Sequence, residues 1–133
     1  MMDNIEKLVD AAEELGWSVN LYTQENADGK LENYAEISQL SPAGEDFRFE
    51  VFYEDADSLV RQVCEAYEDF DPDNHVEELL IAKANGLAGV PRASVLVRDA
   101  DEIDKMLDEL SDKLIDVLAN MREEGFVNDK GRT

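Results

Sequence analysis

The stretch WSVNLYTQENADGKLENYAEISQLSPAGEDFRFEVFY, residues 17–53, decides the fold. Its first part alternates the apolar Trp17, Val19 and Leu21 with polar neighbours, which is typical of a strand that buries one face. The segment NADGK, residues 26–30, then contains an Asp-Gly pair, a strong signal for a tight turn between two strands. We therefore expect a β-hairpin to begin at residue 17.

Two further segments of the same stretch alternate in the same way. The first, at about 31–40, puts Ala35 and Ile37 on one face, and the turn-rich SPAGED leads into the second, FRFEVFY, residues 47–53. The three segments predict an antiparallel meander of three strands. The opposite face of this sheet would carry aromatic residues among charged ones, namely Tyr22, Tyr34 and Phe52.

Helical periodicity appears before and after the sheet. A first helix is expected between a capping residue, Asp3, and a terminating glycine, Gly16. A second is expected over 56–69, and a third from Pro72, a favoured first-turn residue, to near Gly86. The first two have their apolar residues on one face, as helices that pack on a sheet do.

The last part of the chain predicts the longest helix. After a short helical segment at 92–98, Asp99 and Glu102 match the spacing of a capping box and open a helix that ends near Gly125. The expected order is α-β-β-β-α-α-α, an α+β fold with a three-stranded meander and about four helices. We expect one domain over 1–125 and a flexible C-terminal tail over 126–133.

The most unusual property of the chain is its charge. It contains 33 acidic and 12 basic residues among 133, which gives a net charge of -21. Small domains typically have a net charge of roughly 2 to 8, of either sign. A charge of -21 repels phosphate, so neither nucleic acid nor an anionic membrane is an expected direct ligand. Basic proteins are the expected partners.

Cysteine and histidine usage excludes several kinds of site. The single cysteine, Cys64, forms no internal disulfide, and with His75, the single histidine, it cannot complete a Cys/His zinc cage. Cys64 lies on an apolar helical stripe, which is typical of a buried small residue and not of a nucleophile. We expect neither an enzyme nor a cofactor. The N-terminal sequence MMDNIEKLVD is unlike a signal peptide, and we expect a cytoplasmic protein.

The segment EDFDPDNHVEEL, residues 68–79, raises the question of a calcium loop. If Asp69 takes the first ligand position of an EF-hand, the required glycine is replaced by Asn74 and the required glutamate by Leu80. Helix capping explains the aspartates better, because Asp71 directly precedes Pro72 at the start of the third helix. We therefore predict caps here and not a metal site.

Charge is unevenly distributed along the second half of the chain. Residues 54–78 contain ten acids and one base, and residues 99–124 contain ten acids and three bases. Between them, residues 79–98 contain no acid and three bases. We call this segment with its Lys83, Arg92 and Arg98 the basic island. Two acidic helical zones are therefore expected on either side of it.

The last helix presents two contrasting faces. Its apolar residues step by four and three, a heptad-like seam for packing on the domain or on a partner helix: Ile103, Leu107, Leu110, Leu114, Val117 and Met121. Five aspartates line the opposite face, and we call them the acidic ridge: Asp101, Asp104, Asp108, Asp112 and Asp116. A second candidate acidic patch lies on the second helix: Glu65, Glu68 and Asp69.

Carboxylates four residues apart on a helix lie about 6 Å from each other, which is comparable to phosphate spacing along a DNA strand. The ridge therefore suggests a nucleic-acid mimic that binds a basic DNA- or RNA-binding protein. A solvated acidic face that only confers solubility is the simpler alternative. A third is an interaction or scaffolding module without mimicry, including a homo-oligomer, that uses the aromatic sheet face or the seam. An enzyme or a calcium-binding protein fits the sequence least.

Two resemblances accompany these patterns. The opening order α-β-β-β-α resembles a double-stranded RNA-binding domain, but that family's second helix meets phosphate with lysines, and here the corresponding residues 54–58 read EDADS. In SPAGEDFRFEVF and DFDPDNHVEELLIAKANGLAGVP the chain resembles small acidic proteins carried on mobile elements of gut Gram-positive bacteria. That resemblance implies an antagonist of host defence, such as an anti-restriction or anti-CRISPR protein.

Overall fold

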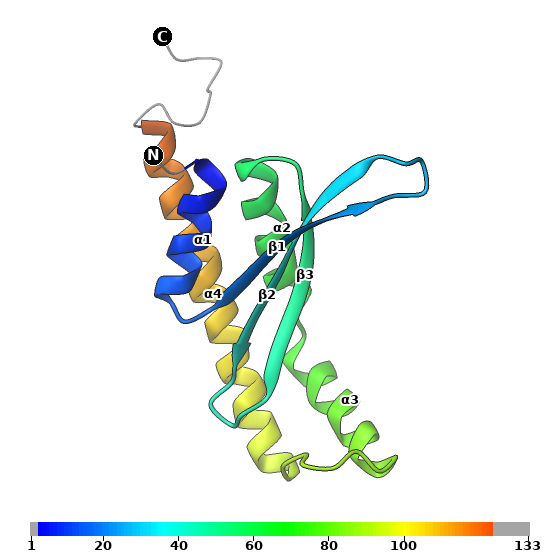
Figure 1. Ribbon diagram of the computed structural model, residues 1–133. Coiled ribbons are helices and arrows are strands. Elements are labelled where there is room, and N and C mark those ends of the chain that lie inside the picture. Colours follow the sequence, from blue (N-terminus) through cyan, green and yellow to red (C-terminus); the bar gives the residue numbers. More distant parts are fainter. Residues whose placement is uncertain (1–2, 124–133) are drawn as a thin grey trace.

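The computed structural model describes residues 3–123. This part of the chain forms one three-stranded sheet and four helices in the predicted order, an α+β fold (Figure 1). The elements are α1 (Asn4–Glu14), β1 (Ser18–Glu25), β2 (Leu31–Leu40), β3 (Asp46–Tyr53), α2 (Ala56–Asp69), α3 (Pro72–Ala84) and α4 (Ala93–Glu123). The tail predicted over 126–133 and the predicted helix end near Gly125 lie outside the described residues.

The sheet is the predicted antiparallel meander, with strand order β1-β2-β3. Its register places Tyr22 opposite Tyr34, and Tyr34 opposite Phe52. The rings of Tyr22 and Tyr34 stack with centroids 5.5 Å apart, and Phe52 meets Tyr34 edge-on at 5.8 Å. The outer face of the sheet therefore carries one aromatic row across all three strands, as the alternation predicts.

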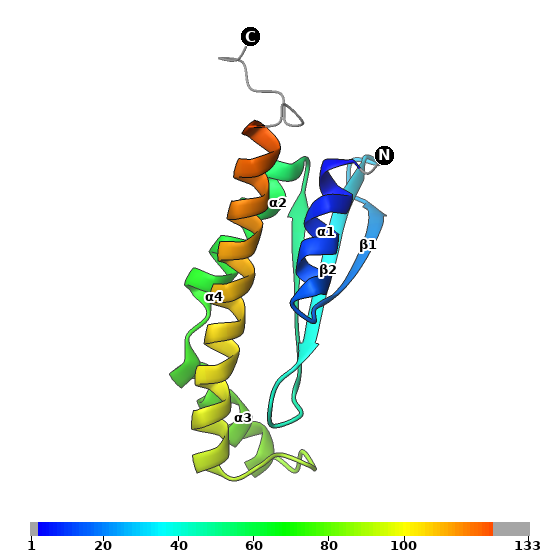
Figure 2. The same cartoon turned by 90° about the vertical axis from the view of Figure 1, so that its left-hand side faces the viewer.

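The helices cover the other face of the sheet. Figures 1 and 2 show α1, α2 and α4 on this face, while α3 packs beside the beginning of α4 at one end of the molecule. The turn that joins β1 and β2 projects beyond the helical layer (Figure 1). The seam of α4 faces into the core, where all its residues except the half-buried Val117 are buried. The domain itself therefore fills the seam, which is the first of the two predicted alternatives.

Local capping follows the sequence at several helix ends. Asp3 accepts a hydrogen bond from the Glu6 backbone N–H at 2.8 Å and begins α1. Asp71 accepts from the Asp73 N–H at 3.0 Å at the start of α3, which confirms the capping prediction for this residue. Gly16 follows the end of α1 with φ +95°, a left-handed conformation that glycine adopts without strain.

The predicted capping box at Asp99 is wrong. Residues 93–98 and the following residues belong to one continuous helix, α4, and Asp99 lies within it, only 4% exposed. Its carboxylate accepts hydrogen bonds from the Ser41 hydroxyl at 2.5 Å and from the Ala43 backbone N–H at 2.9 Å. Asp99 therefore secures the turn between β2 and β3 instead of the start of a helix.

Candidate functional site: the acidic face of helix α4

The acidic ridge lies on the side of α4 that faces away from the core. At 3.6 residues per turn, its five aspartates spread over about 120° of the helix circumference, opposite the buried seam. Asp101, Asp108, Asp112 and Asp116 are exposed, and Asp104 is half-buried. Because α4 is uninterrupted over 31 residues, the ridge has a rigid backbone, and it extends over about 22 Å between its first and last aspartate.

The cations near the ridge interact with other acids. Lys105 pairs with Glu102 at 3.5 Å, Lys113 pairs with Glu14 of α1 at 3.5 Å, and Arg122 contacts Asp57 of α2. Within residues 3–123, no ion pair involves any of the five ridge aspartates. The ridge is therefore, within the described chain, a row of carboxylates without direct ion pairs, in which neighbouring carboxylates repel one another. Lys105 lies on the same helix face, three residues before Asp108, and pairs with Glu102.

Tyr67 of α2 lies beside the centre of the ridge, and the pKa of its hydroxyl responds to the negative charge of the ridge. The charge of Asp108 raises the pKa of the Tyr67 hydroxyl above its usual value, and partial desolvation adds to this. The charges of Asp104 and Asp112 act in the same direction. The charges of three ridge carboxylates thus act on one phenol. The sequence pattern does not reveal this proximity, because Tyr67 fits the apolar stripe of its helix equally well.

The structure brings only part of the second acidic patch next to the ridge. Glu65, Glu68 and Asp69 are all exposed on α2. Glu68 acts on Cys64 together with Asp112 of the ridge, so these two carboxylates flank the same side chain. By helical periodicity, Glu65 and Asp69 point progressively away from that flank. The acidic surface is therefore continuous from the ridge to Glu68 only.

Cys64 itself is half-buried between α2 and α4. Burial raises the pKa of its thiol, as do the charges of Glu68 and Asp112, while the nearby Ser111 hydroxyl acts in the opposite direction. The net effect is a raised pKa, so the thiol remains protonated at neutral pH. This agrees with the prediction that nothing in its surroundings activates Cys64 as a nucleophile.

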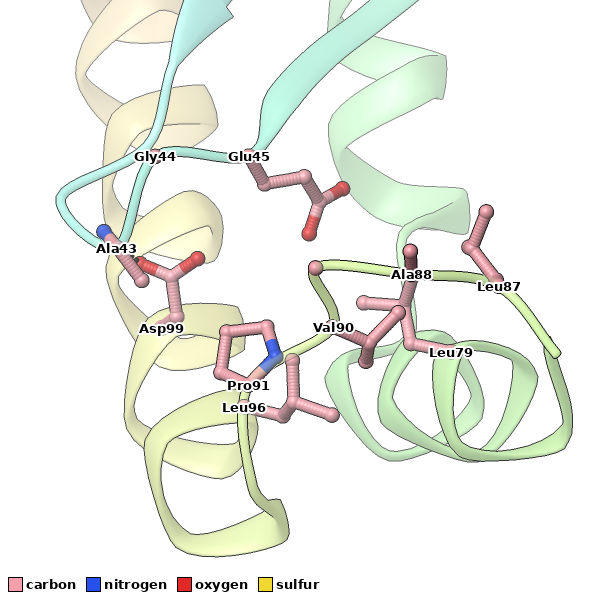
Figure 3. A pocket seen from close by; sticks show the side chains of 11 residues that line it. Ala43, Gly44, Glu45, Leu79, Leu87, Ala88, Val90, Pro91, Leu96 and Asp99 are labelled. Carbon is pink, nitrogen blue, oxygen red and sulfur yellow. Dashed lines mark hydrogen bonds between the residues drawn. The ribbon is translucent and has the colours of Figure 1, made fainter. Parts of the chain in front are cut away.

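The basic island lies at the end of the molecule where α4 begins. A hollow of about 200 Å³ opens there between the β2–β3 turn, α3 and the connection that follows it (Figure 3). Apolar side chains form one wall, and Glu45 and Asp99 lie on the other (Figure 3). Lys83 donates to the Pro91 carbonyl at 3.5 Å, while Arg98 borders a second hollow beside Asp99.

His75 also takes part in organising this end. Its Nε2 lies 2.8 Å from one Glu45 oxygen and 3.0 Å from the other, and its ring packs against Phe47 and Phe70. The contact links the start of α3 to the β2–β3 turn. No local signal in the sequence links His75 to Glu45, which lies thirty residues earlier.

Among residues 3–123, no group of three or more His, Cys, Asp or Glu side chains is arranged to hold a metal ion. No helix in the described range has the length and apolarity needed to cross a membrane.

The fold and the site define a class: a small α+β domain with one three-stranded sheet and a long helix that displays a row of carboxylates. Comparisons of the chain with protein-family models, with curated proteins and with solved structures found no match. The inference of function therefore starts from the ridge.

Proposed function

We propose that the protein is an interaction domain whose acidic ridge binds a basic DNA- or RNA-binding protein in place of its nucleic acid. The observation that carries this proposal is the absence of any ion pair to the five ridge aspartates within residues 3–123, although Lys105, Lys113 and Arg122 of α4 each pair with another acid. Uncompensated like charges destabilise the free protein. A cationic partner surface would relieve that repulsion on binding.

The charge density of the ridge supports mimicry of a nucleic-acid strand. Five carboxylates separated by four intervals over about 22 Å have a mean axial spacing of about 5.6 Å, and one strand of duplex DNA carries one phosphate per about 3.4 Å of axis. Glu68 of α2 extends the acidic surface beside Asp112, so the charges are not confined to a single line. Ile115 is 49% exposed within this surface and offers one apolar contact.

The choice of aspartate adds to the argument. Glutamate has the higher helix propensity, so five aspartates on one helix face cost helix stability. Their shorter side chains hold the charge closer to the rigid backbone, which restricts its position as a phosphate mimic requires. Inhibition of a restriction or CRISPR nuclease, which are basic nucleic-acid-binding proteins, is the biological role that this proposal favours.

A pull-down from bacterial lysate tests the proposal. Tagged wild-type protein is compared with a ridge variant in which all five aspartates are replaced by asparagine, which preserves shape and removes charge. The matched control removes five exposed charges away from the ridge: Asp10→Asn, Glu13→Gln, Asp28→Asn, Glu50→Gln and Glu54→Gln. Bound proteins are identified by mass spectrometry, and captures are repeated with excess duplex DNA and at raised salt.

The proposal predicts that wild type and control capture the same nucleic-acid-binding protein, that the ridge variant does not, and that duplex DNA and salt each displace it. A partner that the ridge variant retains, or that duplex DNA leaves in place, would contradict mimicry. Such a result would favour an interaction module that uses another surface.

A further inference from the structure

Strand β1 has a free edge whose backbone groups can be assigned from the hairpin. The Asn26 N–H donates to the Lys30 carbonyl at 2.8 Å, so this pair is a hydrogen-bonded one. Hydrogen-bonded pairs alternate along an antiparallel ladder, and the even-numbered residues of β1 therefore bond to β2. The odd-numbered residues direct their N–H and C=O groups outward: Val19, Leu21, Thr23 and Glu25.

Nothing in the described part of the chain pairs with this edge. β1 is the first strand in the order β1-β2-β3, and no hydrogen bond within residues 3–123 reaches its outward groups from another element. An edge of this kind is a template for another strand. Natural sheets usually protect such edges with charged residues, prolines or bulges.

The two edges of the sheet differ in that protection. The Ser41–Glu45 hydrogen bond fixes the pattern for β3, whose outward groups belong to its even-numbered residues, among them the charged Asp46, Arg48 and Glu50. In β1, Glu25 is the only charged residue. Residues 18–24 are therefore a neutral stretch at one edge of the sheet, whereas the other edge carries three charged residues with outward backbone groups. The neutral stretch marks the part of the sheet where two such acidic molecules repel each other least.

Side chains on both faces of β1 are also left incompletely covered. Leu21, on the helix-facing side, is 39% exposed. On the outer side, the aromatic row of Phe52, Tyr34 and Tyr22 ends at β1 with no further neighbour. A fourth strand beside β1 would cover Leu21 and continue the row.

We propose that β1 pairs antiparallel with β1 of a second copy of this chain, with Tyr22 opposite Tyr22, to form a six-stranded sheet. In this register Leu21 faces Thr23, and Val19 faces Glu25, so no charged residue faces another. The aromatic row then runs across all six strands. A two-fold axis makes the contact self-complementary.

A second copy fits this edge better than a basic segment of another protein. Glu25 is the only carboxylate in β1 that could attract such a segment. The cationic partner proposed above is attracted instead by the ridge on α4. The two interactions therefore use different surfaces and respond to salt in opposite directions, because salt screens the repulsion between two copies of charge -21.

Sedimentation velocity of the full chain tests the dimer. We expect the dimer dissociation constant to fall by about tenfold or more when the salt concentration rises from about 0.1 M to about 1 M. Thr23→Pro removes one outward N–H, which an edge strand tolerates, and should abolish the dimer. If Thr23→Pro does not fold, Thr23→Asp serves instead, because it adds like charge beside the axis and removes no backbone donor.

Disulfide trapping tests the register. Tyr22→Cys in a Cys64→Ala background should form a linked dimer in a glutathione buffer, because facing residues in a non-hydrogen-bonded pair have Cα atoms about 4.5 Å apart. Gln24→Cys in the same background is the matched control. In the proposed register its two copies lie about 13 Å apart and should not link.

A chain that remains monomeric at every salt concentration would overturn the proposal. So would a dimer that survives in folded Thr23→Pro or in Thr23→Asp, or linkage at position 24 equal to that at position 22. The ridge variant provides a further separation, since it leaves β1 unchanged and should dimerise at least as well as wild type. Loss of partner capture with retained dimerisation in this variant would show that the two interactions use separate surfaces, whereas loss of dimerisation would contradict the pairing through β1.

Discussion

Replacing Asp99 with alanine should destabilise the protein more than any substitution on the exposed face of the same helix. The Asp99 carboxylate is 4% exposed and accepts from the Ser41 hydroxyl and the Ala43 N–H. The Ser41 oxygen in turn accepts from the Glu45 N–H at 3.0 Å, so the whole β2–β3 turn depends on this contact. Its loss removes the link between the turn and α4.

The magnitude follows from the two hydrogen bonds. A hydrogen bond to a charged group contributes about 1.5 to 3 kcal/mol, and the energy recovered by no longer burying the charge offsets part of the sum. We expect Asp99→Ala to lower the free energy of unfolding by about 2 to 4 kcal/mol. Asp99→Asn should cost about 1 kcal/mol, because its amide can still accept from Ala43 and donate to the Ser41 oxygen.

Urea unfolding followed by circular dichroism measures both values, with Asp101→Ala as the exposed control two residues away. The control should change stability by less than about 0.5 kcal/mol. An Asp99→Ala effect no larger than that of the control would refute the assignment of Asp99 as the anchor of the turn. Equal losses in Asp99→Asn and Asp99→Ala would refute the hydrogen-bond reasoning.

Five further outcomes are expected. Replacing the three ridge aspartates nearest Tyr67 with asparagine should lower the pKa of its phenol toward the usual value, as ultraviolet titration against Tyr67→Phe will show. Because the folded-state pKa is raised, the Tyr67 contribution to stability is complete below about pH 10 and is lost as the pH rises above it, which unfolding at alkaline pH measures. The ridge variant should unfold at a higher temperature than wild type at low salt and depend less on salt, since it carries less self-repulsion. Gly16→Ala should cost about 1 kcal/mol or more in urea unfolding, because an alanine at φ +95° is strained and its Cβ would lie 3.1 Å from the Gln39 side chain. The Cys64 thiol should react more slowly with a disulfide reagent in the native protein than in urea, because its pKa is raised in the fold.

The order of elements could be predicted because each element carries its own local signals. Strict alternation between Trp17 and Tyr53, with turn residues between the runs, specifies the meander before any tertiary contact is considered. The ends of α2 and α3 were predicted equally well, since Asp71, Pro72 and Gly86 act on their own neighbouring backbone. Such features depend on residues a few positions apart.

Asp99 could not be predicted for the opposite reason. Its spacing from Glu102 is that of a capping box, and only the position of the β2–β3 turn, fifty-eight residues earlier at Ser41, makes it a buried anchor. The spacing of Asp99 and Glu102 fits a local capping box, but Asp99 is used instead for a tertiary contact with the β2–β3 turn. The Glu45–His75 contact at the same end is long-range in the same way.

The position of the ridge was predictable, and its electrostatics only in part. Helical periodicity places the five aspartates on one face without reference to the rest of the chain. That Lys113 pairs with Glu14 of α1, and Arg122 with Asp57 of α2, depends on how the helices pack. These contacts engage two cations of α4 away from the ridge, and the case for a docking surface depends on them.

The central claim is that the ridge binds a basic protein where nucleic acid would bind. Titration calorimetry of the purified partner with wild type, the ridge variant and the five-charge control tests it most directly. Five ion pairs of about 0.2 to 1 kcal/mol each predict a loss of about 1 to 5 kcal/mol in the ridge variant, with the control within about threefold of wild type and duplex DNA competing with both. Equal affinity of the ridge variant and the control would contradict the claim.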